Sequence, residues 1–241
     1  MISMAARRAG PVAAILLVIA GAAWAQGLTV RGRVSLVSAR SGKPTADNSQ
    51  AVVWLNPLDD PRVSWKPGDA GPFRLVQKNK RFIPHILVVP VGAVVEFPND
   101  DPFFHNVFSL FNGKRFDLGL YEAGTTRTVT FNSPGVSYIF CNIHPEMSAV
   151  VMATQSPYYA LSNAAGSFTI TNIPAGWYQL NVWHERCLPE TLKAATRDVV
   201  VSSSASTLGE IRLPESGNLL ANHKNKYGQR YEPVPASTLG Y

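Results

Sequence analysis

The stretch from Cys141 to Met147, CNIHPEM, places a thiol, an imidazole and a thioether close together in the chain. The whole sequence has only two cysteines, four methionines and five histidines, so such a grouping is uncommon by chance. Sulfur and imidazole nitrogen are donors that transition metals bind. The stretch therefore predicts a metal site, with an ordinary turn between two strands as the alternative.

The strand expected just before this stretch positions the thiol. In VSYIF, residues 136–140, side chains alternate between two faces, so Ile139 and Cys141 share one face and the aromatic residues share the other. The Cys141 sulfur then points into the interior of the sheet at the strand end. His144 and Met147 follow in the loop that returns to the next strand, so the three donors can converge on one point.

A fourth donor has to come from elsewhere, and His105 in FFHNVF stands where a neighbouring strand is expected to begin. One thiolate, two imidazoles and a weak axial thioether form the ligand set of blue-copper electron-transfer sites. Structural zinc sites gather more thiolates, and calcium and magnesium prefer oxygen. Thiolate and thioether favour Cu(I) while imidazole accepts Cu(II), so electron transfer needs little rearrangement. The sequence predicts one copper ion held by His105, Cys141, His144 and Met147.

The first 25 residues predict export. They contain Arg7 and Arg8, a short apolar run, and Ala23-Trp24-Ala25, a small-x-small pattern that a signal peptidase cuts. We expect residues 1–25 to be a signal peptide cleaved after Ala25, with the mature chain in the periplasm. The apolar run is too short to span a bilayer comfortably, and no later segment approaches about 20 apolar residues, so no transmembrane segment is expected in the mature chain.

Ordinary structural interpretations exist for each candidate ligand. Exported proteins with two cysteines often bridge them, so a disulfide between Cys141 and Cys187 is the main alternative to a copper thiolate. An isolated histidine or methionine in a strand is more often a buried structural residue than a ligand. No metal is assigned to the remaining histidines, His85, His184 and His223.

Charge and composition argue against several function classes. Loss of Arg7 and Arg8 with the leader lowers the formal net charge from +6 to +4, which indicates no particular partner. Basic residues concentrate in one segment, which we interpret as a solvated edge strand and loop. The segment lacks the aromatic residues that alternate with basic ones in nucleic-acid sites. Its basic residues are Arg62, Lys66, Arg74, Lys78, Lys80 and Arg81. No paired catalytic carboxylates and no Ser-His-Asp constellation are evident, so an enzyme is not favoured.

Short runs rich in Val, Ile, Phe, Tyr and Thr recur between Gly, Pro, Asn and Asp, which is typical of an all-β sandwich. Helical periodicity is hard to find after the leader. The number of expected strands exceeds one small sandwich, so two are predicted. Residues 214–241 lose the alternation and are expected to form an extended tail.

The residues HNVF followed by CNIHPEM resemble the cupredoxins, in particular plastocyanin and amicyanin, over about 80 residues. The resemblance implies a Greek-key β-sandwich at 72–153 with the four ligands named above. It also implies that Asn106 stabilises the ligand loop through hydrogen bonding near Cys141, and Pro145 matches the family's His-Pro step. Glu146 departs from the pattern: a carboxylate there can favour Cu(II), alter partner choice or displace Met147 as ligand.

A second resemblance covers NAAGSFTITNIPAGWYQLNVWHE, which is similar to the carboxypeptidase regulatory-like, transthyretin-like β-sandwich. The opening strands of that family are missing just upstream but resemble VRGRVSLVSARSGKPTADNSQAVVWL near the N-terminus. We therefore expect a discontinuous domain, residues 27–60 and 154–213, with the cupredoxin-like unit inserted; the alternative is that residues 27–70 add strands to that unit. The combination resembles exported methylamine-utilisation-type proteins.

Together these resemblances imply a periplasmic one-electron carrier that exchanges electrons with a redox partner protein through His144. Two other functions stay open. One is a copper carrier or sensor without an electron-transfer role. The other is a carbohydrate- or protein-binding module, which rests on the second sandwich alone.

Overall fold

The computed structural model describes residues 27–60, 64–110, 113–217 and 223–231. The described chain is built from β-strands, with one short α-helix and one 3-10 turn. The expectation of an all-β fold with two sandwiches is confirmed. The expected signal peptide, residues 1–25, lies outside the described residues. Among the helices of the described part, none is long and apolar enough to cross a membrane.

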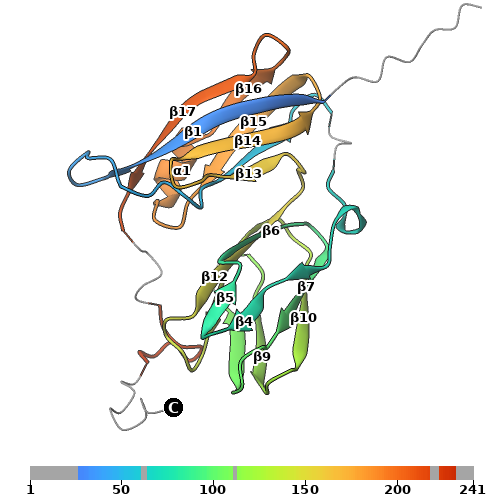
Figure 1. Ribbon diagram of the computed structural model, residues 1–241, viewed down its shortest axis with the longest axis vertical. Coiled ribbons are helices and arrows are strands. Elements are labelled where there is room, and N and C mark those ends of the chain that lie inside the picture. The colour runs from blue at the N-terminus through green and yellow to red at the C-terminus, as the bar shows by residue number, and fades with distance from the viewer. Residues whose placement is uncertain (1–26, 61–63, 111–112, 218–222, 232–241) are drawn as a thin grey trace, which may run out of the picture.

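Two units lie one above the other in Figure 1, and we name them by their relation to the candidate metal residues. The site unit, residues 73–154, contains two sheets of order β6-β12-β11-β8-β9 and β10-β7-β3, with a β4-β5 hairpin. Its strands are β3 (Phe73–Arg74), β4 (Val76–Lys78), β5 (Arg81–Ile83), β6 (Ile86–Pro90), β7 (Ala93–Pro98), β8 (His105–Ser109), β9 (Phe116–Tyr121), β10 (Thr126–Phe131), β11 (Gly135–Cys141) and β12 (Ser148–Thr154).

The flanking unit consists of residues 28–57 and 159–215, and its sheets have the orders β14-β1-β17 and β13-β2-β15-β16. A 3-10 turn, Pro67–Asp69, lies in the connection to the site unit. The elements of the flanking unit are β1 (Leu28–Ser38), β2 (Val52–Pro57), β13 (Tyr159–Leu161), β14 (Ser167–Ile173), β15 (Gly176–Trp183), α1 (Pro189–Ala195), β16 (Arg197–Val201) and β17 (Thr207–Glu215).

The site unit is inserted into the flanking unit along the chain. Strand β1 pairs with β14 in antiparallel and with β17 in parallel orientation, and β2 pairs with β13 and β15. Strands before and after the site unit therefore complete each other's sheets. This pairing is what a discontinuous domain requires, and its assignment to the carboxypeptidase regulatory-like family remains a proposal.

Alternation along β11 sorts its side chains between two environments. Ile139 and Cys141 are fully buried and belong to the core between the two sheets of the site unit. Tyr138 and Phe140 lie on the other face, where Tyr138 packs near Trp183 of the flanking unit. The expectation that the Cys141 side chain points into the sheet interior is confirmed.

The two units share a buried apolar contact surface. It joins side chains of β6 and β12 to side chains of β2 and β15: Val52, Ile86, Val88, Val150, Met152 and Trp183. At its edge the His85 Nε2 atom lies 2.7 Å from the Glu185 Oε2 atom. The units are therefore joined by apolar packing and by an ion pair.

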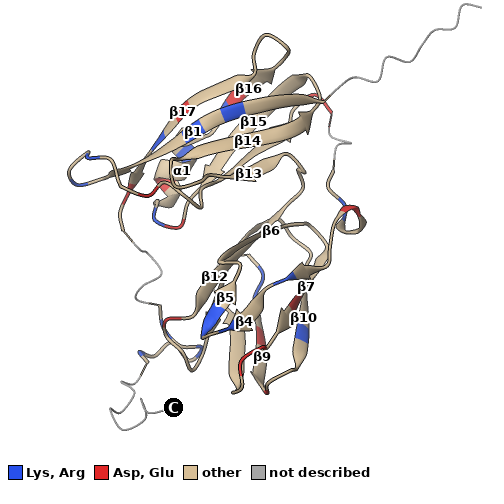
Figure 2. Cartoon of the chain, viewed as in Figure 1, with Lys and Arg blue, Asp and Glu red and all other residues tan. Residues whose placement is uncertain are grey.

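Some elements differ from the sequence expectations. Strands β5, β9 and β13 and helix α1 were not expected, and β17 extends to Glu215, two residues beyond the predicted boundary at 213. Figure 2 shows basic residues in blue at β4 and β5, within the expected basic segment. At the sheet edge formed by β3, the Arg74 Nε atom lies 2.7 Å from the Glu96 Oε2 atom.

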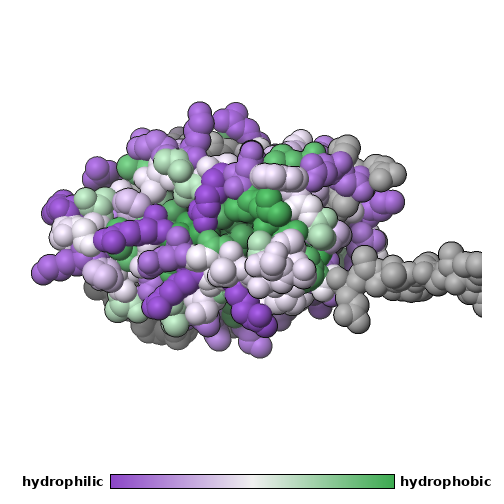
Figure 3. Space-filling view, turned by 90° about the horizontal axis from the view of Figure 1, so that it is seen from above, coloured by the Kyte–Doolittle hydropathy of each residue, from purple (hydrophilic) through white to green (hydrophobic). Residues whose placement is uncertain are grey.

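Figure 3 views the end formed by the flanking unit, where apolar side chains gather amid hydrophilic ones.

Candidate metal centre

Two neighbouring strands and one loop bring three donor side chains together. His105 is the first residue of β8, and Cys141 is the last residue of β11. These strands are antiparallel, with Cys141 opposite Val107, so the start of one lies beside the end of the other. His144 comes from the loop between β11 and β12. The donor atoms of His105, Cys141 and His144 all lie within 4.8 Å of one another.

The spacing of the donors fits a single metal ion. Cys141 Sγ lies 3.6 Å from Nδ1 of His105 and 3.6 Å from Nδ1 of His144, and the two Nδ1 atoms are 3.1 Å apart. Donors bound at about 2.0–2.3 Å and spread by about 100–120° around one ion stand about 3.1–3.8 Å from each other. A soft sulfur with two imidazoles is also a donor set that copper accepts.

Met147 returns to the core at the end of the ligand loop. The Met147 N–H donates to the His144 carbonyl at 3.1 Å, and the Cys141 N–H donates to the Met147 carbonyl at 3.2 Å. These bonds close the loop on itself. The Met147 side chain is fully buried in the same core cluster as Cys141. The structure thus places this thioether on the cysteine side of the sandwich, and its role as a ligand remains a prediction.

The Cys141 thiol lies in a buried environment with N–H groups around its sulfur. Burial raises the pKa of this thiol, while the backbone N–H groups of Ile143, Asn106 and His144 act in the opposite direction. A thiol with a raised pKa keeps its proton near neutral pH, so a metal has to displace that proton when it binds. The three N–H groups are placed to stabilise the thiolate that results.

His105 is oriented by a buried carboxylate. Its Nε2 atom lies 2.9 Å from Asp101 Oδ2, and the two side chains are 0% and 5% exposed. Because a carboxylate accepts, Nε2 carries the proton, and Nδ1 of a neutral His105 presents its lone pair to Cys141 and His144. Burial acts to raise the pKa of Asp101, but hydrogen bonds from the Lys80 N–H, His105 and the Asn79 N–H together hold it below its ordinary value.

His144 is the more accessible of the two imidazoles. It is partly buried, whereas His105 is fully buried. Desolvation lowers the pKa of His144, and the adjacent His105 ring lowers it further. The ring of Phe103 lies against both imidazoles, with centroid distances of 5.2 Å to His105 and 5.6 Å to His144. The lowered pKa makes His144 available as a neutral donor near neutral pH.

Asn106, expected to stabilise the ligand loop, contacts that loop through its backbone, and its stabilising role remains a prediction. Its carbonyl accepts the Asn142 N–H at 3.1 Å, and its own N–H points at the Cys141 sulfur. Its side chain turns to β9 instead, where Nδ2 donates to Asp117 Oδ1 at 2.7 Å. The Asn106 Oδ1 atom is buried and has no hydrogen-bond partner among the described residues.

Pro145 and Glu146 are both exposed on the ligand loop. Pro145 lines a surface pocket of 350 Å³ between the loop and residues 225–231. The Glu146 charge acts to raise the pKa of both Cys141 and His144, so it lies close enough to act on the donor cluster electrostatically. Its exposure separates it from the buried Met147 side chain.

Part of the C-terminal tail packs on the ligand loop, which the sequence pattern did not predict. The Tyr231 hydroxyl donates to the Cys141 carbonyl at 2.9 Å, and the Lys226 N–H donates to Asn142 Oδ1 at 2.9 Å. The His223 ring stacks on Phe140, with centroids 4.0 Å apart and planes inclined by 16°. We name residues 223–231 the strap, because they hold the outer side of the loop.

The alternative of a disulfide is wrong. Cys141 and Cys187 are both free and buried, and they belong to the cores of different units. His85 and His184 also lie outside the donor cluster. His85 pairs with Glu185, and His184 Nε2 donates to the Ser49 carbonyl at 3.2 Å. Their interpretation as structural histidines agrees with these contacts.

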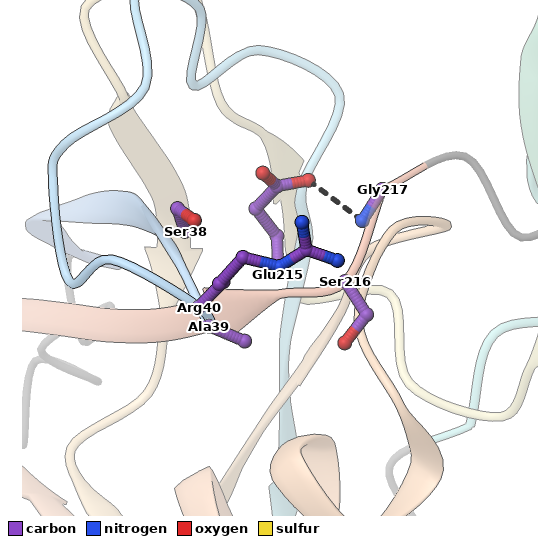
Figure 4. Close-up of a pocket in the computed structure, with 6 residues that line it drawn as sticks. All are labelled: Ser38, Ala39, Arg40, Glu215, Ser216 and Gly217. Atoms are coloured by element: carbon purple, nitrogen blue, oxygen red, sulfur yellow. Dashed lines mark hydrogen bonds between the residues drawn. The ribbon is translucent and has the colours of Figure 1, made fainter.

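A second surface pocket lies at the junction of β1 and β17 in the flanking unit. It has a volume of 540 Å³, and its lining residues are shown in Figure 4. Glu215 Oε2 accepts the Gly217 N–H there at 3.1 Å. The lining contains Arg40 and Glu215 as its charged side chains and has no histidine or cysteine. Among the described residues, the group of three such side chains that could hold a metal ion is His105, Cys141 and His144.

A scan against protein-family models finds no match, and no curated protein matches. Solved structures do resemble part of the chain. A purple cupredoxin from Nitrosopumilus maritimus is 24% identical over 34% of this chain and 100% of its own, with a TM-score of 0.32. A Cu-containing nitrite reductase from Thermus scotoductus is 24% identical over 42% of this chain and 25% of its own, with a TM-score of 0.34.

An amicyanin variant in its reduced Cu(I) form is also similar. It is 16% identical over 42% of this chain and 98% of its own, with a TM-score of 0.33. These neighbours are copper proteins by name, and each covers less than half of this chain. The functional proposal therefore has to come from the residues of the site.

Proposed function

We propose that this protein is a type 1 copper protein that carries single electrons. The observation that supports it best is the convergence of Cys141 Sγ with the Nδ1 atoms of His105 and His144, where Cys141 and His105 are fully buried. With Met147 buried in the same core, the donor set is that of a blue-copper centre. Bound copper would supply a Cu(II)/Cu(I) couple.

The residues around the site would serve this couple in distinct ways. Closure of the loop by its own backbone bonds would keep the donor positions nearly the same in both oxidation states. Phe103 and the apolar core would exclude water, and the partly exposed His144 would be the edge through which a partner protein exchanges an electron. Periplasmic location, the redox partner and the carboxypeptidase regulatory-like assignment of the flanking unit belong to the same proposal.

Copper loading of the purified mature protein tests this function. An intense blue colour that bleaches reversibly on reduction is expected. Tight Cu(I) binding without a stable Cu(II) form would instead favour a copper carrier or sensor. Cys141→Ser should abolish the blue centre, because a hydroxyl cannot supply the soft charged donor.

Cys187→Ser is the matched control for that variant. Cys187 is also buried and free, but it lies in the core of the flanking unit. The colour should survive this change. Copper binding unaffected by the Cys141 change would contradict the proposal.

A further inference from the structure

The buried carboxylate of Asp101 connects the candidate metal centre to a turn of the site unit. Asp101 Oδ2 accepts from His105 Nε2 at 2.9 Å and from the Lys80 N–H at 3.0 Å, and Oδ1 accepts from the Asn79 N–H at 2.6 Å. The Asn99 side chain fixes the Asp101 backbone by accepting its N–H at 3.1 Å. The carboxylate is therefore held from several sides and has little freedom to leave His105.

The partners of this carboxylate supply hydrogen bonds but no full opposite charge while His105 is neutral. Burial of a carboxylate is costly unless hydrogen bonds and an opposite charge compensate it. Two backbone N–H groups and one imidazole N–H supply the hydrogen bonds. A cation bound at Nδ1 of His105 would supply the opposite charge through the ring, so the arrangement is better satisfied with a metal than without one.

We propose that Asp101 is a positioning residue of the metal centre that fixes the His105 tautomer and favours Cu(II) over Cu(I). This proposal rests on the proposed function. A carboxylate hydrogen-bonded to the far nitrogen of a ligating imidazole sets the ring orientation and raises the basicity of the donor nitrogen. Cu(II) carries the larger charge, so it gains more from a more basic donor and from a nearby negative charge.

Asp101 also has a structural role that the test must separate from this one. Asn79 and Lys80 both have positive φ, each 54°, and form the two-residue turn between β4 and β5. Turns of this kind join antiparallel strands, and the Asp101 oxygens accept both of their N–H groups. Loss of Asp101 can therefore loosen the hairpin, whereas a change in tautomer or in relative Cu(II) and Cu(I) affinity reports on the metal centre.

The experiment compares wild type, Asp101→Asn and the control Asp100→Asn in the full mature chain. Asp100 is the adjacent acid and is exposed. Asp101→Asn should weaken Cu(II) binding about 10–100-fold in a competition assay, the usual effect of removing such a partner. Cu(I) binding should change less. A tenfold loss of Cu(II) affinity relative to Cu(I) affinity raises the reduction potential by about 59 mV.

A second readout needs no copper. NMR spectra of the apo protein that use long-range proton–nitrogen couplings should show the Nε2–H tautomer of His105 in wild type and in Asp100→Asn. They should show a mixture of tautomers in Asp101→Asn. If Asp101→Asn does not fold, Asp101→Glu is measured instead, because its longer side chain keeps the charge but moves it.

The outcomes separate this inference from the proposed function. Wild type that takes up no copper contradicts the proposed function, and the apo spectra then decide the tautomer part alone. Wild type that binds copper while Asp101→Asn keeps the same potential, the same ratio of affinities and the same tautomer overturns the role of Asp101. A hairpin that loosens without any of these changes also overturns it, because that result leaves Asp101 a purely structural residue.

Discussion

At the scale of single residues, the identity of a donor was easier to predict than the partner that orients it. His105, Cys141 and His144 could be singled out because thiols and imidazoles are scarce and their order along the chain is distinctive. Asp101 could not, since the sequence NDD offers two adjacent acids that look alike. Only the fold buries Asp101 beside His105 and leaves Asp100 exposed.

Met147→Leu tests the weakest of the predicted ligands. Leucine is close to methionine in volume, so the free energy of unfolding of the apo protein should fall by less than about 1.5 kcal/mol. Copper and the blue colour should be retained, because the axial bond of such centres is long and weak. The reduction potential should rise, since leucine removes a donor from Cu(II) and leaves a drier site.

Met152→Leu is the control for this change. Met152 is equally buried, but it belongs to the apolar contact surface between the units rather than to the core that contains Cys141. Its substitution should leave the potential unchanged. Equal shifts in the two variants, measured by redox titration, would show that Met147 acts only as a core residue.

At the scale of elements, alternation predicted a strand well where turn residues such as Gly, Pro, Asn and Asp bounded it on both sides. Strand β9 was missed because Asp117 and Gly119 interrupt its alternation. Gly119 has a φ of 68°, and the register between β8 and β9 shifts between Asn106 and Phe108. Irregular edge strands of this kind depend on contacts with a neighbour, which a local pattern does not contain.

Asp117→Ala tests how β9 supports the ligand loop. Asp117 accepts the Asn106 amide at 2.7 Å, the Gly119 N–H at 2.9 Å and the Lys226 ammonium at 2.8 Å. Its loss leaves the buried Asn106 amide without its acceptor, which typically costs about 1–3 kcal/mol. Urea unfolding of the apo protein should show this loss of stability, and a change below about 0.5 kcal/mol would contradict it.

The control for this variant is Asp198→Ala. Asp198 is an exposed acid of β16 in the flanking unit. Substitutions at exposed positions away from such contacts usually change stability by less than about 0.5 kcal/mol. A loss in both variants of similar size would mean that Asp117 acts only through the net charge of the chain.

At the scale of the whole molecule, the ion pair between the units makes stability depend on pH. His85 Nε2 lies 2.7 Å from Glu185 Oε2, and Nδ1 lies 3.2 Å from the Ser148 carbonyl. Both partners are acceptors, so both ring nitrogens donate and His85 is charged in this geometry. The hydrogen bond to Glu185 raises the pKa of His85 above 6.5, despite an opposing effect of burial.

The pKa of His85 is higher in the folded protein than in the unfolded chain. Its contribution to stability is therefore fully present at pH values below the pKa of the unfolded chain, and it is lost as pH rises through the pKa of the folded protein. Burial acts to raise the pKa of Glu185, but the hydrogen bond and charge of His85 hold it below 4.5. The Glu185 contribution is thus lost as pH falls through that lowered value. The pair should stabilise the protein most between about pH 4.5 and about pH 6.5.

Glu185→Gln should therefore lower the melting temperature at about pH 5.5 and have a smaller effect at about pH 8.5. Thermal unfolding of the apo protein at both pH values measures this difference. Glu190→Gln, an exposed acid in α1, is the control and should show no such pH dependence. An equal loss for Glu185→Gln at both pH values would mean that the pair contributes no pH-dependent stability.

The strap is the feature of the whole molecule that a sequence pattern could least reveal. Residues 223–231 are polar and lack alternation, so they were expected to be extended, yet they contact a loop 84 to 90 residues earlier in the chain. Their hydrogen bonds go to the Cys141 carbonyl and the Asn142 side chain, and the His223 ring covers Phe140. The strap therefore adds its contacts to a loop that otherwise holds itself by a few backbone bonds.

Ending the chain at Gly217 removes the strap and should loosen the ligand loop while leaving both sandwiches folded. Each lost hydrogen bond is worth about 1 kcal/mol, and about 1.4 kcal/mol corresponds to a tenfold change in an equilibrium. Hydrogen exchange at residues 141–147 should thus accelerate at least about fivefold, and copper should pass faster to a chelator. Tyr231→Phe deletes one of these bonds and should give a smaller change in the same direction. Unchanged exchange in the truncated protein would show that the loop is held by the site unit alone, with the strap only resting on it.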